Sequence, residues 1–320
     1  MATYIVTGGA GFIGSHLVDR LMENDQEVLV IDDLSSGKER YLRRWEGHER
    51  FTFSQQKLED LTTIPHGFTD AKAIFHLAAL PSVRVGIDHP DVQWEKNVVA
   101  TYHLLKAVKK AEIPYLLFSS SSTVYGDPQT LPTPETHLLE PISIYGSTKV
   151  ACESLISGFA HTFDLRALVF RFANIMGPRV NHGVVYDFVR KLEETPEKLE
   201  ILGDGTQNKS YLHVSDLLDG IFTVFEAFQE NGEAFEVYNI GNEGRTTVMR
   251  IAEIVSEEMG LTPEFHTTGG VKGGRGWKGD VKEMLLDITK ITTMGWSPKY
   301  SSEEAIRRTA RMLAEGGAGP

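Results

Sequence analysis

The chain has 320 residues, a formal net charge of −12 and one cysteine, Cys152. The acidic balance argues against nucleic acid and anionic membranes as partners, and a lone cysteine excludes an intrachain disulfide and a cysteine-rich metal site. No signal-peptide pattern opens the chain and no apolar run approaches about 18 residues, so we expect a cytoplasmic protein with no membrane partner.

Strand and helix signals alternate through the N-terminal half. Short apolar runs predict strands at Tyr4–Thr7, at Glu27–Ile31 and from Ala73, Tyr115 and Leu165. Helical patterns run to about Glu23 and over residues 91–111 and 145–161. Apolar runs that alternate with helices indicate βαβ units and a buried parallel sheet, which predicts an α/β fold.

The pattern changes after about Arg171, where short elements alternate with loops rich in glycine, asparagine and proline. Such irregular segments are often functional. A helix over 215–229 and a strand over 235–240 are expected to return to the first domain. We therefore predict a first domain over 1–170 plus about 211–244, and a smaller C-terminal α/β substrate lobe over 171–210 and 245–320.

A glycine loop separates the first strand from the first helix. The stretch "TGGAGFIGSH" contains Gly8, Gly11 and Gly14 at intervals of three. These glycines permit a tight turn, close approach of the backbone to a pyrophosphate, and packing of the helix on the strand. The helix N-terminus then faces the phosphates. The alternative is a plain glycine-rich turn, but the strand–loop–helix context favours dinucleotide binding on a Rossmann-type doubly wound parallel sheet.

Two acidic residues, Asp32 and Asp33, end the second strand. A carboxylate there accepts hydrogen bonds from ribose hydroxyls and repels a 2′-phosphate, which favours NAD over NADP. The following basic residues could serve a 2′-phosphate, although a solvated helix face explains them better: Lys38, Arg40, Arg43 and Arg44.

The stretch "YGSTK" places Tyr145 and Lys149 four residues apart. Residues at i and i+4 share a helix face, and a nearby ammonium is expected to lower the pKa of a phenol. Such pairs are also common on plain helix surfaces. The serine-rich end of a predicted strand, Ser119–Gly126, precedes this helix, and hydroxyls at the carboxyl end of a parallel strand lie at the ligand crevice.

Together these motifs resemble the extended short-chain dehydrogenase/reductases, and within them the NAD-dependent epimerase/dehydratase family. The similarity spans essentially the whole chain, is strongest to members that interconvert UDP-glucose and UDP-galactose, and includes "HLAA", "SSSSTVYG", "RFANIMGP", "LGDGTQNKSYLHVSDL" and "YNIGN".

The resemblance implies roles for individual residues. The implied catalytic residues are Tyr145, Lys149, Ser121, Ser122 and Thr123, and among the hydroxyl residues Ser121 matches the family's catalytic serine. Tyr145, Lys149 and the following residues are implied to bind NAD: Gly8, Gly11, Phe12, Ile13, Gly14, Asp32, Asp33, Leu34, Ser35, Ser36, Gly37, Lys57, Leu58, Leu77, Ala78, Ala79, Leu80, Asn97 and Ala173. The UDP-sugar is implied to contact Ser121, Tyr145, Asn174, His182, Val184, Val185, Tyr186, Lys209, Arg275 and Met284.

Three positions depart from the family pattern. Lys57 stands near a usual aspartate, so we expect an altered adenine contact. Lys209 replaces an arginine and loses its bidentate fork, so diphosphate binding should depend more on Arg275, whose local spacing is one residue longer than usual. Met284 stands where a large residue excludes N-acetyl groups, and its flexibility leaves their tolerance open.

The expected reaction follows from what precedes "VYG". Related dehydratases carry an acid pair there and related decarboxylases a glutamate, whereas this chain has Ser122 and Thr123. The resemblance therefore implies redox-neutral 4-epimerisation of UDP-glucose and UDP-galactose with NAD kept bound. Alternatives are 4-epimerisation of an N-acetylated or uronate UDP-sugar, net oxidoreduction, and a non-catalytic sensing module. Asn174 argues mildly against the uronate, whereas Arg84 could serve its carboxylate.

Three further expectations complete the prediction. No histidine or acidic cluster has metal-ligand spacing, so we expect no metal. His76 and His213 are expected to be packed structural residues. Relatives pair the helices near 91–111 and 145–161 in a dimer, so a homodimer is expected.

Overall fold

The protein, described here from a computed structural model over residues 2–65 and 68–316, divides into two compact units. The first unit comprises Met1–Val124, Ile144–Arg171 and Phe225–Tyr238, and the second comprises Tyr125–Ser143, Phe172–Val224 and Asn239–Pro320. This division differs from the predicted one in three segments. Residues 125–143, 211–224 and 239–244 belong to the second unit rather than to the first, so the helix predicted over 215–229 is divided after Val224.

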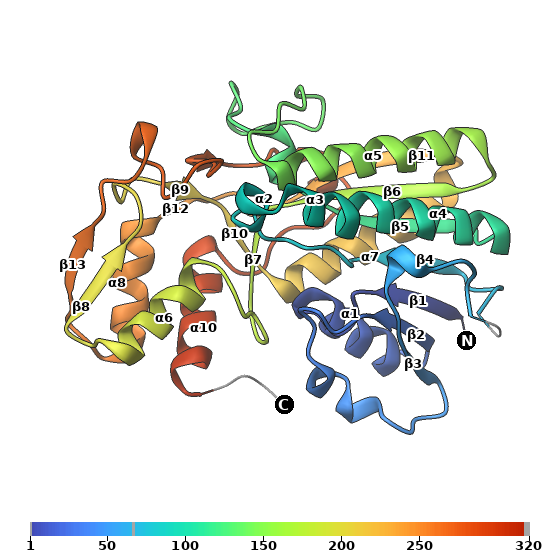
Figure 1. Cartoon of the computed structure of the whole chain (residues 1–320), viewed down its shortest axis with the longest axis horizontal. Coiled ribbons are helices and arrows are strands. Elements are labelled where there is room, and N and C mark those ends of the chain that lie inside the picture. The colour runs from blue at the N-terminus through green and yellow to red at the C-terminus, as the bar shows by residue number, and fades with distance from the viewer. Residues whose placement is uncertain (1, 66–67, 317–320) are drawn as a thin grey trace. The chain divides into compact units, whose positions relative to one another are not determined.

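A seven-stranded sheet carries the first unit, in the order β3-β2-β1-β4-β5-β6-β11 (Figure 1). Its strands are β1 (Thr3–Thr7), β2 (Glu27–Asp32), β3 (Phe51–Gln55), β4 (Ala73–His76), β5 (Tyr115–Ser121), β6 (Arg166–Phe172) and β11 (Phe235–Ile240). The pairs β1–β2, β1–β4, β2–β3 and β4–β5 are parallel. The predicted α/β class with a Rossmann-type sheet is confirmed. The chain order reverses between β1 and β4, where folds of this type place their ligand crevice.

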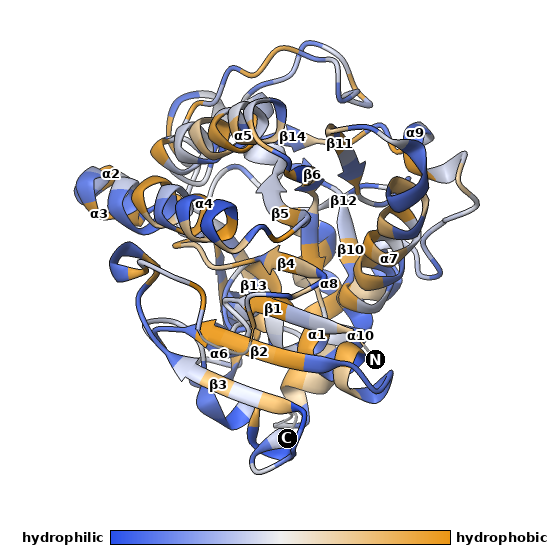
Figure 2. Cartoon of the chain, turned by 90° about the vertical axis from the view of Figure 1, so that its right-hand side faces the viewer, coloured by the Kyte–Doolittle hydropathy of each residue, from blue (hydrophilic) through white to orange (hydrophobic). Residues whose placement is uncertain are grey.

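The inner strands of the sheet are rich in apolar side chains, because both faces of these strands are buried. Helices α4 (Ala100–Ala111) and α5 (Ile144–Thr162) lie side by side (Figure 1) and share one buried cluster with β1, β2 and β5. Phe225 of α7 (Val214–Asn231) packs edge-on against Phe75. Figure 2 shows β2 hydrophobic for most of its length, whereas the edge strand β3 is paler.

The helix predicted over 91–111 is three segments rather than one. They are α3 (Pro90–Gln93), the π-helix η4 (Trp94–Val99) and α4. The carbonyl oxygen of Asn97 accepts hydrogen bonds from Thr101 Oγ1 at 2.6 Å and Cys152 Sγ at 3.4 Å. These side-chain bonds compete with the regular backbone ladder, and π-segments of this kind are frequent at functional sites.

Gly14 marks the closest approach of α1 (Phe12–Glu23) to the glycine loop. A Cβ at Gly14 would overlap the carbonyl oxygen of Gly8 and lie 2.8 Å from the Cα of Gly9. We expect Gly14→Ala to lower the free energy of unfolding by about 2–3 kcal/mol, because backbone must shift to admit the methyl group. Urea unfolding measures this change.

The matched control is Gly158→Ala in α5, where an added Cβ meets no atom within 4 Å. This substitution should stabilise the protein by about 0.5–1 kcal/mol, because alanine has the higher helix propensity. Equal losses for both variants would contradict the packing argument.

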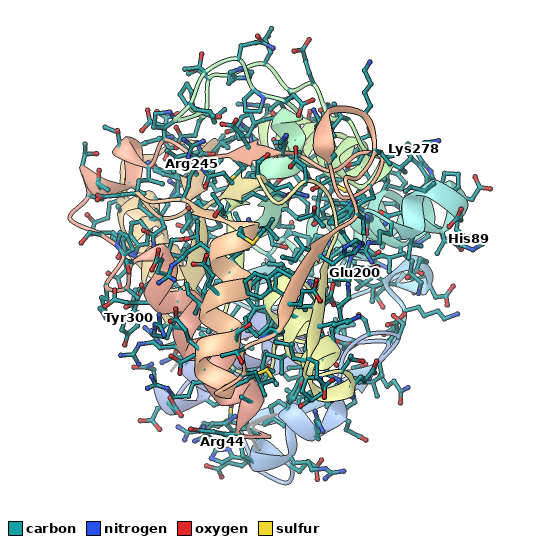
Figure 3. The ribbon with its side chains drawn as sticks, turned by 90° about the vertical axis from the view of Figure 1, so that its left-hand side faces the viewer. Arg44, His89, Glu200, Arg245, Lys278 and Tyr300 are labelled. Carbon is teal, nitrogen blue, oxygen red and sulfur yellow. The ribbon has the colours of Figure 1, made fainter. Side chains whose placement is uncertain are left out.

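The second unit contains three small sheets. Their strands are β7 (Asn174–Met176), β8 (Lys198–Ile201), β9 (Asn208–Lys209), β10 (Tyr211–His213), β12 (Thr246–Thr247), β13 (Glu264–Thr267) and β14 (Glu283–Met284). Helices α6 (Val184–Glu194), α8 (Val248–Met259) and α10 (Ser302–Ala314) bury one apolar cluster. Figure 3 looks onto this unit, where Arg245 pairs with Glu283 at 3.0 Å and Glu200 pairs with Lys191 at 3.0 Å.

The remaining elements are single turns. They are α2 (Val85–Asp88), α9 (Thr289–Thr292), η1 (Glu39–Tyr41), η2 (Arg43–Trp45), η3 (Leu58–Asp60), η5 (Ser122–Tyr125) and η6 (Lys272–Gly274). Over residues 2–65 and 68–316, no helix combines the length and apolar character needed to cross a membrane.

Candidate active site

The glycine loop holds the end of β1 against the end of β4. The Gly11 N–H donates to the Gly8 carbonyl at 3.0 Å, and a Cβ on Gly8 would lie 2.6 Å from the backbone nitrogen of Ala78. Helix α1 then begins at Phe12 with no side-chain cap and no acidic residue in its first turn. A helix start of this kind presents N–H groups and a partial positive charge to an anion.

Asp32 and Asp33 end β2 beside this loop but have different partners. Asp32 Oδ2 accepts the Ala10 N–H at 3.0 Å, and its Oδ1 accepts the Leu34 N–H at 2.8 Å. Burial raises the pKa of the Asp32 carboxyl, and these two N–H groups oppose the rise. Each oxygen keeps a further lone pair, so Asp32 can still accept bonds from a ligand's hydroxyl groups.

Asp33 is instead tied to Lys96, whose Nζ lies 2.7 Å from Asp33 Oδ2 and 2.9 Å from Glu59 Oε1. Burial acts to raise the pKa of Asp33, but the bonds from Lys96 and Ser35 outweigh it and the net direction is downward. Among the other predicted cofactor residues nearby, Lys57 is exposed and the Leu58 side chain is buried in the core cluster.

Asn97 positions the loop over residues 77–80. Its Oδ1 accepts the Leu80 N–H at 2.8 Å, and its Nδ2 donates to Gln93 and to Thr148 Oγ1, each at 2.9 Å. Asn97 is buried, so these bonds lock the loop after β4 to helix α5. The structure thus gives Asn97 a role in ordering this loop, and its contact with the cofactor stays a prediction.

Ser121, Tyr145 and Lys149 come together in the first unit. Tyr145 is 9 % exposed and hydrogen-bonds to Ser121. Thr123 donates to Ser121 Oγ from its backbone N–H at 3.2 Å and its hydroxyl at 3.0 Å. The Lys149 ammonium donates to the Ser119 carbonyl at 2.7 Å and lies 5.8 Å from the centre of the Tyr145 ring. The predicted shared helix face is present.

The predicted lowering of the Tyr145 pKa is wrong for this arrangement. Burial raises the pKa of the phenol, and the hydrogen bond with Ser121 opposes the rise without cancelling it. Burial also lowers the pKa of Lys149 to about 8, against the effects of Cys152 and Glu153. Both shifts have one physical cause, since a low-dielectric environment disfavours the charged form of each group.

Two buried groups support this triad. His76 lies between Thr7 Oγ1 at 2.8 Å and Thr101 Oγ1 at 2.9 Å, and burial followed by the Lys149 charge lowers its pKa to about 3. His76 is therefore a neutral, packed histidine at neutral pH, as predicted. Glu153, one turn after Lys149, forms a buried bidentate pair with Arg171 at 2.7 and 3.1 Å.

The other predicted substrate residues lie in the second unit. Asn174 Nδ2 donates to the Ser210 carbonyl at 3.0 Å, and His182 Nδ1 lies 2.9 Å from Asn181 Oδ1. The Val185 side chain packs in the apolar core of this unit, while Val184 and Tyr186 are partly buried in the first turn of α6. Ala173, predicted among the cofactor residues, is buried and donates its N–H to the Ile240 carbonyl at 2.9 Å.

The two predicted diphosphate residues are both paired with carboxylates. Arg275 donates two hydrogen bonds to Asp127, at 2.9 and 2.7 Å. Lys209 Nζ lies 2.7 Å from Asp280 Oδ1. Met284 is buried and faces Lys209 in the register of β9 and β14.

Sequence reasoning missed four residues that organise these sites: Lys96, Glu153, Asp127 and Asp280. Lys96 is 63 positions from Asp33, and Arg275 is 148 positions from Asp127. No local spacing signals a pair so distant. Glu153 alone had a sequence signal, since it follows Lys149 at i+4 on the same helix face.

Comparison with known proteins identifies the family. Residues 4–241 match the model of the NAD dependent epimerase/dehydratase family. A UDP-glucose 4-epimerase of Mycolicibacterium smegmatis is 33% identical over 319 residues, covering 97% of each chain. The UDP-glucuronic acid decarboxylase 5 of Arabidopsis thaliana is 32% identical, covering 94% of this chain and 86% of its own. A crystal structure of a UDP-galactose 4-epimerase has a TM-score of 0.88 at 39% identity, covering 98% of this chain and 99% of its own.

The chain therefore belongs to the NAD dependent epimerase/dehydratase family and is an enzyme whose cofactor is NAD. The residues present fit this cofactor. The uncapped start of α1 suits a pyrophosphate, the absence of side chains at Gly8, Gly11 and Gly14 permits close approach, and Asp32 suits a ribose. The loop over residues 77–80, ordered by Asn97, stands beside this cradle at the ends of β1 and β4.

Asp32 rather than Asp33 is expected to carry the ribose contact. We expect Asp32→Asn to weaken NAD binding about tenfold, because the amide has no charge and keeps one acceptor oxygen for two N–H donors. Asp33→Asn should have a smaller effect, because Lys96 already holds that carboxylate. Calorimetric titration with NAD measures both affinities. A larger loss for Asp33→Asn would reverse the assignment.

Proposed function

We propose that the protein is a UDP-glucose/UDP-galactose 4-epimerase that inverts carbon 4 of the sugar through a 4-keto intermediate, redox-neutral overall. One observation carries the choice of reaction. Ser122 and Thr123 begin η5, directly after Ser121. They offer hydroxyl groups where dehydration or decarboxylation would need a carboxylic acid. With no further acid or base at these two positions, return of the hydride is the simplest outcome.

NAD supplies the hydride acceptor and donor and, when oxidised, a positive charge that favours the phenolate. Tyr145 takes the proton of the 4-hydroxyl as hydride leaves carbon 4, and it returns the proton to the carbon-4 oxygen when hydride is added to the opposite face of the 4-keto sugar. Ser121, already bonded to Tyr145, orients the hydroxyl toward the phenol oxygen. Lys149 stabilises the phenolate electrostatically, since its buried ammonium is held by the Ser119 carbonyl near the ring.

The second unit is proposed to hold the UDP portion. Arg275 and Lys209 supply positive charge for the diphosphate, and the segment from His182 to Tyr186 serves the uridine. A bidentate guanidinium matches the oxygens of a phosphate group better than an ammonium does, so Arg275 should contribute more than Lys209.

A second substrate remains within this proposal. Met284 is buried beside Lys209, and a flexible thioether chain can move to admit an N-acetyl group at carbon 2. We therefore propose UDP-N-acetylhexosamines as the alternative substrates, to be compared directly with UDP-galactose.

The test is to incubate the purified enzyme with UDP-galactose and trace NAD, following sugar products and the absorbance of reduced nicotinamide. Conversion to UDP-glucose without stoichiometric NADH supports the proposal. Accumulation of NADH or of a 4-keto-6-deoxy sugar would contradict it. Parallel reactions with UDP-N-acetylgalactosamine and UDP-glucuronate rank the alternatives.

A homodimer is proposed as well. Large apolar side chains are exposed along the helices that relatives use for pairing, including Val92, Trp94, Tyr102 and Ile144, with Trp94 54 % exposed. Trp94 and Ile144 also line a surface cavity of about 290 Å³ with Pro90 and Ser147. Several large exposed apolar side chains on these helices support a partner surface. Analytical ultracentrifugation of the NAD-bound enzyme measures the oligomeric state.

A further inference from the structure

The guanidinium of Arg275 is already engaged by an anion of the protein itself. Its Nη1 lies 2.9 Å from Asp127 Oδ1 and its Nη2 lies 2.7 Å from Asp127 Oδ2. This is the parallel two-bond geometry with which arginine also binds a phosphate group. Nη1 additionally donates to the Asp280 carbonyl at 2.5 Å, which fixes the guanidinium from a second side.

The two aspartates near Arg275 differ in how firmly they are held. Asp280 is 3 % exposed, and its carboxylate accepts bonds from Lys209 at 2.7 Å and from the Gly276 N–H at 3.1 Å. The Asp127 side chain is 47 % exposed, and over the described residues 2–65 and 68–316 its carboxylate bonds to Arg275 alone. Asp280 is therefore a fixed part of the unit, whereas Asp127 can be displaced into solvent.

The backbone on both sides of Asp127 is held in an ordered conformation. Gly126 has a φ of +64° and packs so closely on the Glu140 carbonyl that a Cβ there would overlap it. The same segment is anchored where the Thr133 N–H donates to the Leu285 carbonyl at 2.8 Å. Asp127 therefore meets Arg275 from an ordered turn.

We propose that Asp127 is an internal competitor for the diphosphate of the nucleotide sugar: its carboxylate uses the two Arg275 donors that the diphosphate requires, and substrate binds by displacing it. This inference rests on the proposed function only for the role of Arg275. Solvent screens the half-exposed Asp127 carboxylate, so a diphosphate with more charge and more oxygens can replace it on the guanidinium. The competitor weakens binding of substrate and product alike, and uniform tight binding would not accelerate the chemical step.

The experiment is calorimetric titration of the NAD-loaded enzyme with UDP at low ionic strength. Asp127→Asn should bind UDP on the order of two- to fivefold more tightly than the unsubstituted enzyme, because the amide no longer occupies the guanidinium. Asp127→Ala should change the affinity in the same direction. In steady-state assays KM should fall while kcat does not rise. Unchanged or weaker UDP binding by both variants would overturn the proposal, since Asp127 would then hold Arg275 in place for the ligand.

Two further variants separate this mechanism from a general charge effect. Glu140→Gln removes the same charge from the exposed end of the same segment, and it should leave UDP affinity unchanged. In an Arg275→Ala background, Asp127→Asn should have no effect on affinity. A persistent gain in that background would assign the effect to long-range repulsion and contradict the proposal.

Failure of this inference is distinguishable from failure of the proposed reaction. If UDP-galactose is not epimerised but Asp127→Asn still tightens UDP binding through Arg275, the competitor role stands and the reaction is wrong. If the reaction proceeds and Asp127→Asn weakens UDP binding, the reaction stands and the competitor role is wrong. If UDP does not bind to the unsubstituted enzyme, Arg275 has no diphosphate role and the inference falls.

Discussion

Replacing Tyr145 with phenylalanine is expected to lower kcat by about 10³–10⁴-fold while NAD remains bound. The substitution removes one oxygen that transfers the proton and keeps the ring that packs at the start of α5. Conversion of UDP-galactose to UDP-glucose, followed by coupled assay, measures the loss, and calorimetric titration with NAD measures retention of the cofactor. Near-normal turnover by this variant would remove Tyr145 from the acid–base role.

The matched control is Tyr115→Phe, which removes a phenol oxygen at the start of β5, whereas Ser121 of the active site lies at the end of this strand. The Tyr115 hydroxyl accepts a hydrogen bond from Arg166 at 3.2 Å, so its loss should cost about 1 kcal/mol of stability. Its kcat should be unchanged. A similar collapse of kcat in both variants would show that the Tyr145 effect is structural.

Replacing Lys149 with methionine is expected to lower kcat by about 10²–10³-fold through loss of the charge that stabilises the phenolate. Stability should respond in the opposite sense. Burial lowers the pKa of Lys149 to about 8 in the folded protein from 10.5 for a free lysine. The buried ammonium therefore costs stability below pH 8, and that cost is relieved as the pH rises from 8 toward 10.5. At pH 7 the free energy of unfolding of Lys149→Met should be unchanged or higher, as measured in urea.

Deprotonation of Lys149 should also limit the activity of the unsubstituted enzyme at alkaline pH. The active form needs the ammonium, so kcat should fall as the pH rises through about 8, and Lys149→Met should lose this inflection. A Lys149→Met enzyme that is both unstable and inactive would indicate that the lysine is mainly structural. Retention of the inflection would assign it to another group.

The spacing of apolar residues and the positions of turn residues were sufficient to predict strands β1, β2, β4, β5, β6 and β11 and helices α1, α5 and α7, whereas strand β3 and helices α6, α8 and α10 were not predicted. The strand predicted over 235–240 is β11 (Phe235–Ile240), and the helix predicted over 145–161 is α5 (Ile144–Thr162). The π-helix between α3 and α4 was not predictable from a helical pattern. Within this segment the Asn97 carbonyl also accepts a hydrogen bond from Cys152, which lies 55 residues away in the sequence.

The sequence predicted which residues lie at the site, but it did not predict their charge states. A shared helix face predicts that Tyr145 and Lys149 are neighbours, and they are. It does not reveal that both are buried, and burial reverses the expected direction for the phenol. Desolvation depends on every atom packed around a group, so no spacing within five residues can report it.

The amino-acid sequence by itself determined the fold class, the glycine loop, the serine and tyrosine–lysine positions and the pair of carboxylates, Asp32 and Asp33, at the end of the second strand. These features are local, because each is written in a short run whose residues act on their own backbone or on one helix face. The tertiary structure alone decided which groups are paired: Lys96 with Asp33, Glu153 with Arg171, and Asp127 with Arg275. Such pairs join segments distant in the chain, and their geometry exists only once packing has placed both partners.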